Sequence, residues 1–253
     1  MRFALLYNPR LLCERLAIES TRRRRLARLR GTAADRLSPG HIDSLELLEM
    51  LRGEGIDVIY DIGANIGTWT LLAKALYPDA QIHAFEPLPR HRDDFRANLA
   101  RFADVRLHGV ALGNRDQEDR QLHVMDFSDA SSLLALAEPG RSHWGIGEIA
   151  QVPVKLCRLD DYRQRFDLPK PDLIKLDVQG YELEVLKGAK ASLTSVKALI
   201  VEVSFAEFYE GQCLFEELVG FVAEQGFRLK AIGVNTPLGR PLAQTDGLFV
   251  RTT

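Results

Sequence analysis

The sequence predicts an α/β protein with a mostly parallel sheet covered by helices on both faces. Short β-rich runs alternate with helical stretches from Asp57 onward, which is the pattern of βαβ units. A length of 253 residues and an apolar fraction of 46% are sufficient for one packed core. No apolar run is long enough for a membrane-spanning helix, and three scattered cysteines (Cys13, Cys157 and Cys213) predict neither a disulfide framework nor a zinc site. We therefore expect one domain that does not span a membrane and that has a cytoplasmic location.

A short helix is expected before the main pattern. The chain breaks at Pro39, leucines follow at helical spacing (Leu45, Leu48 and Leu51), and Gly53 provides a stop. The elements of the main pattern then follow in order. Strands are expected at 57–61, 81–86, 105–112, 151–159, 172–178, 198–205, 227–234 and 245–252, and helices in the stretch ending at Tyr77 and near 90–102, 182–189 and 212–225.

Residues 114–151 interrupt this pattern. They are polar and irregular, with one expected strand (121–125), a patch of small residues (129–134) and a Gly-rich loop (138–148). Loops of this length within a compact α/β domain usually carry function. Near the end of the chain, the proline-containing segment 235–244 is typical of a hairpin connection, which predicts an antiparallel last strand.

The N-terminal segment differs in charge from the rest of the chain. Nine arginines and only two acidic residues, Glu14 and Glu19, occur in residues 1–30, whereas the whole chain has a net charge of −2. We divide the chain into a basic helical extension (1–41) and a main domain (42–253). The arginines are expected on a solvated helix face that docks on the acidic body of the same or a neighbouring subunit, so a homo-oligomer is one alternative. Contact with an anionic membrane surface or lipid-linked substrate is another, whereas nucleic acid is disfavoured because the remaining chain lacks a basic stripe with interleaved aromatic residues.

The strongest local signal is the segment 57–69, DVIYDIGANIGTW. An apolar strand ends at Asp61 and runs into a turn that contains Gly63 and Asn65, and a helix follows. Such a turn lets the backbone approach a nucleoside-type ligand closely. A dinucleotide site is disfavoured because the motif G-x-G-x-x-G would need glycine at Asn65 and Thr68, and no Walker loop occurs in the sequence.

Glu86 indicates a cofactor that contains adenosine but no phosphate. It follows the second strand in HAFEP, where a carboxylate can accept hydrogen bonds from both ribose hydroxyls. Asp61, just before the turn, is placed to face a ligand ammonium directly or through water. Together with Gly63 and Asn65, these carboxylates predict a site for S-adenosylmethionine. The competing interpretation is a structural strand-to-helix turn with a surface glutamate.

The sequence resembles the FkbM family of S-adenosylmethionine-dependent methyltransferases. The resemblance rests on DIGANIGTWT, AFEP, IKLDVQGYELEVLKGA, EVSF and the closing TDGLFVR, and it covers about residues 42–251. It implies a Rossmann-like class I methyltransferase fold, with a seven-stranded, mostly parallel sheet whose last strand is antiparallel. It also implies O-methylation of a hydroxyl on a sugar, a glycolipid, a polysaccharide or a natural product. The chain departs from many relatives at Ser204, where they carry histidine, and residues 1–41 match nothing in the family.

The resemblance also implies two groups of site residues. One group would hold the cofactor, and the other would face the acceptor from the ends of the fourth and fifth strands and from a nearby loop. The cofactor group is Asp61, Gly63, Asn65 and Glu86, and the acceptor group is Asp177, Glu202, Ser131 and Ser132.

Charged residues within the predicted sheet lead to a related expectation. Lys175 and Asp177 are two residues apart and project from one face of a strand, and Glu202 lies on the neighbouring strand. Buried charges persist when they are paired or functional, so an ion pair between Lys175 and Glu202 is one structural interpretation. Asp177 is expected in the binding crevice, because the carboxyl ends of strands in an open sheet form it.

Methyl transfer to an alkyl hydroxyl needs a base, and three alternatives are open. Asp177 itself, His143 in the Gly-rich loop, or a divalent metal such as Mg²⁺ held by Asp177 and Glu202 could promote loss of the proton. Trp144 is expected over the acceptor, and Tyr181 is a further candidate for stacking on the apolar face of a sugar.

Two other functions compete with this interpretation. The arginine-rich start suggests a methyltransferase of RNA or protein, but residues 178–180 lack the [N/D]-P-P-[Y/F/W] loop used for methylation of adenine or amide nitrogen. A non-catalytic cofactor-binding protein is disfavoured, because the in-facing charges of Lys175, Asp177 and Glu202 cost stability without a packing gain.

Overall fold

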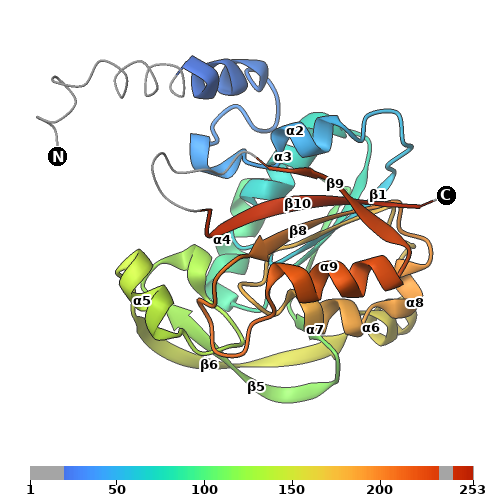
Figure 1. The fold of residues 1–253 in the computed structure, drawn as a ribbon. Helices are drawn as coiled ribbons and strands as arrows, with labels where there is room; N and C mark the ends of the chain where they lie inside the picture. Colours follow the sequence, from blue (N-terminus) through green and yellow to red (C-terminus); the bar gives the residue numbers. More distant parts are fainter. Residues whose placement is uncertain (1–19, 234–241, 253) are drawn as a thin grey trace, which may run out of the picture.

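The main sheet has the strand order β3-β2-β1-β7-β8-β10-β9 in the computed structural model, which describes residues 20–233 and 242–252 except for the side chain of His143 (Figure 1). Neighbouring strands are parallel except for β10, which runs antiparallel to both β8 and β9. This arrangement confirms the predicted Rossmann-like sheet with its antiparallel last strand. The strands are β1 (Val58–Ile62), β2 (Gln81–Phe85), β3 (Val105–His108), β7 (Leu173–Leu176), β8 (Ala198–Ser204), β9 (Phe227–Ile232) and β10 (Gln244–Arg251).

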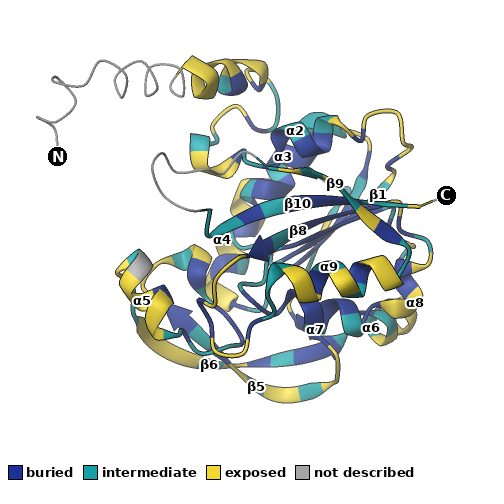
Figure 2. Ribbon diagram, in the orientation of Figure 1, coloured by how far each residue is buried: buried dark blue, intermediate teal, exposed yellow. Residues whose placement is uncertain are grey.

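Alternating residues of the central strands fill a core on each face of the sheet (Figure 2). In β1, Ile59 packs in one core, whereas Tyr60 and Ile62 pack in the other. Parallel strands covered on both faces are buried along their length, and β7 is buried at all of its positions. One face carries α2 (Leu45–Glu49), α3 (Thr68–Leu76) and α4 (Pro89–Leu99), and the other carries α6 (Leu159–Arg165), α7 (Glu182–Lys187), α8 (Lys190–Leu193) and α9 (Phe215–Glu224).

A second sheet with the order β4-β6-β5 lies below α7 in Figure 1. It contains β4 (Ala111–Gly113), β5 (Gln117–Met125) and β6 (Glu148–Arg158). The sequence predicted residues 105–112 as one strand, but the chain leaves the main sheet after β3. Gly109 lies in this break, where an added Cβ would be 1.9 Å from Nη1 of Arg92. The single strand was therefore wrong, because residues 105–108 pair with β2 whereas residues 111–113 pair with β6.

Helix α5 (Glu138–Trp144) occupies most of the predicted Gly-rich loop. Pro139 lies in its first turn, and Gly145 ends it with a left-handed backbone angle φ of 67°. Proline at the start of a helix and glycine at its C-terminal end are boundary signals. In a segment rich in polar residues, this proline and this glycine were interpreted as loop residues, so the predicted loop was incorrect.

The N-terminal segment, as far as it is described, packs on the main domain. Residues 20–28 are helical, and Arg25 is buried with its guanidinium donating to the two carboxylate oxygens of Glu46 at 2.8 and 2.6 Å. Arg28 pairs with Glu49 on the same helix, α2. These arginines thus contact acidic side chains of the same chain. Cys13 and the rest of residues 1–19 lie outside the described residues, as does most of the predicted hairpin connection.

Among the described residues, no helix is both long enough and apolar enough to cross a bilayer.

Candidate active site

A cavity of about 300 Å³ opens at the carboxyl ends of the central strands. The ends of β2, β1 and β7 contribute Glu86, Gly63 and Asp177 to its wall, and β8 and β10 contribute Glu202 and Asp246. The strand order reverses between β1 and β7, and ligands of open α/β sheets bind in the crevice at this point. The volume lies at the lower end of the range for small-molecule sites.

The turn after β1 adopts a left-handed backbone conformation at two positions. The angle φ is 82° at Gly63 and 47° at Asn65. A Cβ at Gly63 would lie 1.8 Å from the carbonyl oxygen of Asp177, so glycine is needed for the ends of β1 and β7 to approach each other. The glycine thus serves the packing of two strands, in addition to leaving the backbone of the turn accessible from the cavity.

Glu86 presents a rigid carboxylate to the cavity. Its Oε2 accepts a hydrogen bond from the backbone N–H of Asn65 at 2.9 Å, and its Oε1 accepts one from the backbone N–H of Leu88 at 2.8 Å. Each carboxylate oxygen can accept a second hydrogen bond, so the group can still bind a diol. Apolar side chains beside it form a surface suited to a nucleoside base: Phe85, Leu88, Val110, Leu112, Leu122 and Leu133. The arrangement therefore fits the ribose and adenine of S-adenosylmethionine.

Asp61 lies behind the cavity wall. It is fully buried, its Oδ2 accepts a hydrogen bond from Thr70 at 2.5 Å, and its Oδ1 is 3.9 Å from Nζ of Lys175. Burial raises the pKa of Asp61, and the Lys175 charge opposes this. Asp61 does not line the cavity, and its contact with a cofactor ammonium, directly or through water, stays a prediction.

Lys175 pairs with Asp177 and Asp61, and the predicted ion pair with Glu202 is absent. Its Nζ is 3.2 Å from Asp177 Oδ2. Asp61 and Lys175 are register partners across β1 and β7, and Asp177 lies two residues further on the same face, so both acids are nearer than the neighbouring strand. Burial alone would lower the pKa of Lys175, but the charges of Asp177 and Asp61 raise it. Lys175 is thus a fixed positive charge at the base of the site.

Glu202 leaves one of its two oxygens free for the cavity. Its Oε2 accepts hydrogen bonds from Nε2 of Gln179 at 3.1 Å and from Nε2 of Gln244 at 3.2 Å. Among the described residues, none donates a hydrogen bond to Oε1. Burial, followed by the negative charge of Asp177, raises the pKa of Glu202 well above its usual value. This carboxyl group therefore has a high affinity for a proton.

Two further acidic residues, which the sequence did not indicate, line the cavity. Asp246 is the register partner of Glu202 in β10, and it accepts a hydrogen bond from Ser44. Asp43 is next to Ser44, and burial raises its pKa to about 6. Asp246 is part of TDGLFVR, but only the pairing register of the last hairpin brings it opposite Glu202. A prediction of that register would have found it.

The segment around η3 (Ser128–Ala130) forms the cavity wall opposite the sheet. Nδ2 of Asn65 donates to Asp129 at 2.7 Å, and Ser132 donates to the carbonyl oxygen of Gln179 at 2.6 Å. Ser131 also lines the cavity. The interruption in the βαβ pattern thus contributes a wall that contacts the turns after both β1 and β7.

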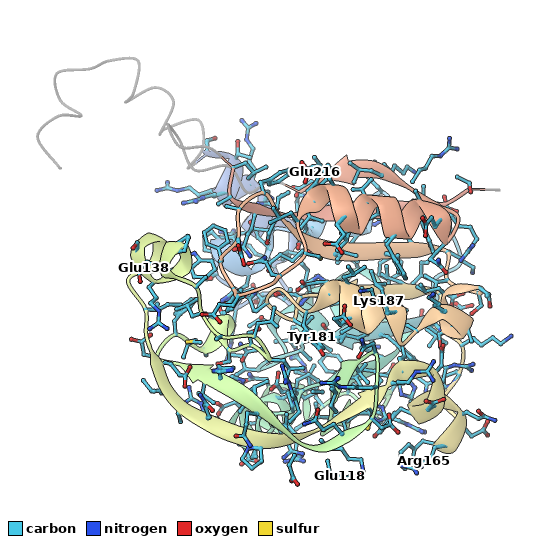
Figure 3. The ribbon with its side chains drawn as sticks, turned by 60° about the horizontal axis from the view of Figure 1, so that its bottom comes forward. Glu118, Glu138, Arg165, Tyr181, Lys187 and Glu216 are labelled. Carbon is cyan, nitrogen blue, oxygen red and sulfur yellow. The ribbon has the colours of Figure 1, made fainter. Side chains whose placement is uncertain are left out.

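Trp144 and Tyr181 do not line this cavity. The Trp144 ring lies 4.7 Å from the Phe208 ring between centroids, and Tyr181 is buried in the core just before α7 (Figure 3). Tyr181 packs in the core and Trp144 is half-buried against Phe208, so neither ring faces the cavity in this structure, and their contacts with the acceptor stay predictions. The role of His143 as a base stays a prediction, since its side chain is not among those described.

A metal site is not evident in the described residues. They contain no group of three or more His, Cys, Asp or Glu side chains arranged to hold a metal ion. Asp177 and Glu202, which the sequence suggested as ligands, are joined by the amide of Gln179, which donates to Asp177 at 2.6 Å and to Glu202 at 3.1 Å. These carboxylates are thus held by a hydrogen-bond donor in this geometry.

The profile of the methyltransferase FkbM domain matches residues 61–229. This chain belongs to the FkbM methyltransferase family. The match begins at Asp61 in β1, includes Glu86, Asp177 and Glu202, and ends at Leu229 in β9, so the resemblance in the sequence is confirmed. The chain therefore contains a methyltransferase domain whose methyl donor is S-adenosylmethionine.

Similar FkbM relatives come from bacteria and archaea. The 2-O-methyltransferase NoeI of Sinorhizobium fredii is 32% identical over 172 residues, covering 61% of this chain and 66% of NoeI. The hexuronic acid methyltransferase AglP of Haloferax volcanii is 30% identical over 167 residues, covering 65% of this chain and 62% of AglP. The 31-O-demethyl-FK506 methyltransferase FkbM of Streptomyces tacrolimicus is 28% identical over 204 residues, covering 69% of this chain and 74% of that protein. The chain spans slightly less than two thirds of the length of NoeI and of AglP.

Proposed function

We propose that this FkbM methyltransferase transfers a methyl group to a hydroxyl of a sugar, a glycolipid, a polysaccharide or a natural product. The observation that carries the proposal is the pair of carboxylates, Asp177 and Glu202, on the opposite side of β1 from Glu86. One end of the cavity is thus suited to a ribose, and the other offers hydrogen-bond acceptors to a hydroxyl. The names of NoeI and of the Streptomyces relative both refer to methylation of an oxygen and agree with this assignment.

S-adenosylmethionine, when bound, supplies a methyl group activated by a positively charged sulfur. The chain has to hold the acceptor oxygen in line and take up its proton. Glu202 is suited to the second task, because Oε1 lacks a partner and the raised pKa gives the carboxylate a high proton affinity. Asp177 accepts hydrogen bonds from Lys175 and Gln179, which hold its carboxyl group beside the acceptor.

The experiment is methyl transfer from labelled S-adenosylmethionine to a panel of acceptors. The panel contains neutral methyl glycosides, amino sugars, uronic acids and lipid-linked sugars, together with RNA and a mixture of peptides. We expect a methyl ether on a glycoside or lipid-linked sugar. Label in RNA or on peptide nitrogen, or no transfer to any acceptor by a protein that binds S-adenosylhomocysteine, would contradict the proposal.

A matched pair of variants tests the residues. Asp177→Asn should lower transfer by about 100-fold or more with binding of S-adenosylhomocysteine retained, because it removes the charge beside the acceptor. Asp167→Asn makes the same exchange at an exposed site just after the end of α6 and should leave transfer unchanged.

A further inference from the structure

We propose that Gln179 is a positioning residue that orients Asp177 and Glu202 toward the acceptor, and that Tyr209 fixes the direction of its amide. The inference rests on the proposed function, because the two carboxylates matter for catalysis only if they meet a hydroxyl acceptor. Gln179 is part of the IKLDVQGYE segment, but no pattern in the sequence assigns it a role.

The amide of Gln179 is placed between the two carboxylates. Its Nε2 donates to Oδ1 of Asp177 at 2.6 Å and to Oε2 of Glu202 at 3.1 Å. An amide nitrogen has two hydrogens, so one group can satisfy both acceptors. The amide carries no net charge, so it joins the two acids without neutralising either.

The two carboxylates and Tyr209 together favour one orientation of the Gln179 amide. Its hydroxyl is 2.9 Å from Oε1 of Gln179 and 2.8 Å from the carbonyl oxygen of Ala130, so its single hydrogen is shared between two acceptors. A flipped amide would turn its oxygen toward Asp177 at hydrogen-bond distance, where two acceptors would repel each other. Tyr209 is fully buried, and Oε1 of Gln212 accepts a hydrogen bond from its backbone N–H at 2.7 Å. The hydroxyl therefore has a fixed position.

The backbone that carries Gln179 is also fixed. The angle φ of Gln179 is 57°, a left-handed conformation that costs a non-glycine residue about 1 kcal/mol or more. Ser132 donates to its carbonyl oxygen at 2.6 Å, and Oε1 of the buried Glu182 accepts hydrogen bonds from the N–H groups of Val178 at 2.9 Å and Gly180 at 3.2 Å. These three contacts hold the strained turn, which directs the side chain of Gln179 into the cavity wall.

This arrangement leaves Oε1 of Glu202 for the acceptor. The amide takes Oε2 of Glu202 and Oδ1 of Asp177, while Lys175 takes Oδ2 of Asp177 at 3.2 Å. Without the shared donor, two neighbouring carboxylates in a buried site would repel each other and turn apart. Gln179 thus sets the direction of the free oxygen.

The decisive variant is Gln179→Glu, which keeps the shape and replaces the donor with a carboxyl group. At neutral pH a third carboxylate would face Asp177 and Glu202. We expect kcat on the glycoside that accepts methyl label in the panel above to fall by about tenfold or more, with the KM for S-adenosylmethionine changed by less than about twofold. At lower pH the protonated Glu can donate its single hydrogen to one of the two carboxylates, so part of the loss of kcat should be recovered as the pH falls.

Two controls separate positioning from a general structural effect. Tyr209→Phe should reduce kcat less than Gln179→Glu does, and the double variant should lose less than the two single losses combined, because both act through one amide. Gln164→Glu makes the same chemical change at an exposed position of α6 and should leave both kcat and its pH profile unchanged. A Gln179→Glu enzyme with wild-type kcat and pH profile would overturn the inference while leaving the proposed function intact.

A stability measurement tests the network without any acceptor. The Tm of the Gln179→Glu protein should fall increasingly below that of the wild type as the pH rises from about 5.5 to about 8.5, because the ionised Glu meets two carboxylates. A constant Tm difference over this range would show that the three groups do not interact and would also overturn the inference. The Tm comparison tests the network even if no member of the panel accepts a methyl group. That outcome would count only against the proposed function.

Discussion

Nδ1 of His83 lies 2.9 Å from Nε2 of His108 where β2 and β3 pair, and the two rings are stacked with their centroids 5.2 Å apart. His83 is fully buried, and its other ring nitrogen has no hydrogen-bond partner. Burial, with a smaller contribution from the neighbouring His108, lowers the pKa of His83 to about 4. Burial and the charge of Arg106 lower the pKa of His108 to about 4 as well. The folded protein therefore keeps both rings uncharged at neutral pH.

This pair predicts a loss of stability in acid. The usual pKa of histidine is 6.5, so below that pH the unfolded chain binds protons while the folded protein does not until near pH 4. Stability is therefore fully present above pH 6.5 and declines as the pH falls toward 4, by up to about 3 kcal/mol for the buried His83. Urea unfolding at several pH values measures it. The decline should be smaller in His108→Gln, whereas a decline of the same size in His108→Gln and in the exposed control His41→Gln would contradict the assignment.

Gly63 and Gly145 provide a second, matched test. Both have a left-handed backbone, with φ of 82° and 67°, but a Cβ at Gly63 would lie 1.8 Å from a carbonyl oxygen while a Cβ at Gly145 would have no neighbour within 4 Å. Gly145→Ala should cost only the conformational term of about 1 kcal/mol. Gly63→Ala adds a clash with Asp177 and should lower the free energy of unfolding by about 3 kcal/mol. Equal losses in the two variants would show that the ends of β1 and β7 are not in contact.

The sequence predicted the main sheet well, because hydrophobic runs report burial directly. The strand at 198–205 is continuously apolar up to Glu202, as expected for a strand covered on both faces, and β8 spans Ala198–Ser204. The second sheet was not predicted because β4 is short and continues a run that begins in β3. What separates them is a change of partner, since β3 pairs with β2 and β4 pairs with β6, and this depends on tertiary contacts that leave no periodic signal.

The site residues were predictable only where the position of a residue within its strand determines its place in the fold. Parallel strands end at the same edge, so Glu86, Asp177 and Glu202 could be expected together. Asp246 could not, because it belongs to an antiparallel strand whose register follows from a long connection. Gln179 could not be predicted for a different reason: its role depends on Tyr209, 30 residues away along the chain.

Glu86 should govern binding of the cofactor. Glu86→Ala removes a carboxylate that faces the cavity and frees the backbone N–H groups of Asn65 and Leu88. We expect the affinity for S-adenosylhomocysteine, measured by titration calorimetry, to fall by about 10- to 100-fold. Glu118→Ala, an exposed position on β5, is the control and should bind normally. An unchanged Kd for Glu86→Ala would place the ribose elsewhere.

Arg25 should stabilise the contact between the N-terminal helix and α2. Arg25 is 5% exposed, and its guanidinium pairs with Glu46, which is more accessible to solvent. Arg25→Ala leaves the partly buried Glu46 without its partner and should lower the free energy of unfolding by about 2 kcal/mol. Chemical denaturation with Arg30→Ala as the exposed control, expected within about 0.5 kcal/mol of the wild type, measures the difference. Equal stability of the two variants would mean that the helix is not anchored through this residue.

The environment that raises the pKa of Glu202 should also lower the free energy of unfolding. Its folded pKa is raised above the usual 4.5, first by burial and then by the charge of Asp177, so as the pH rises through and above 4.5 the unfolded chain releases a proton that the folded protein retains. Stability therefore declines with rising pH until the raised pKa is passed. Glu202→Gln removes this effect, and its Tm should exceed that of the wild type by a margin that grows with pH.

The same variant should lose about 100-fold in kcat, because an amide cannot take up the acceptor proton. Glu224→Gln, at the exposed end of α9, controls for the general effect of losing a charge and should change neither quantity. A stabilised but inactive Glu202→Gln protein is the expected result if the environment of Glu202 costs stability and at the same time gives its carboxylate a high proton affinity. An active one, or one less stable than the wild type at every pH, would assign the proton to another group and leave Asp177 and His143 as the bases to test.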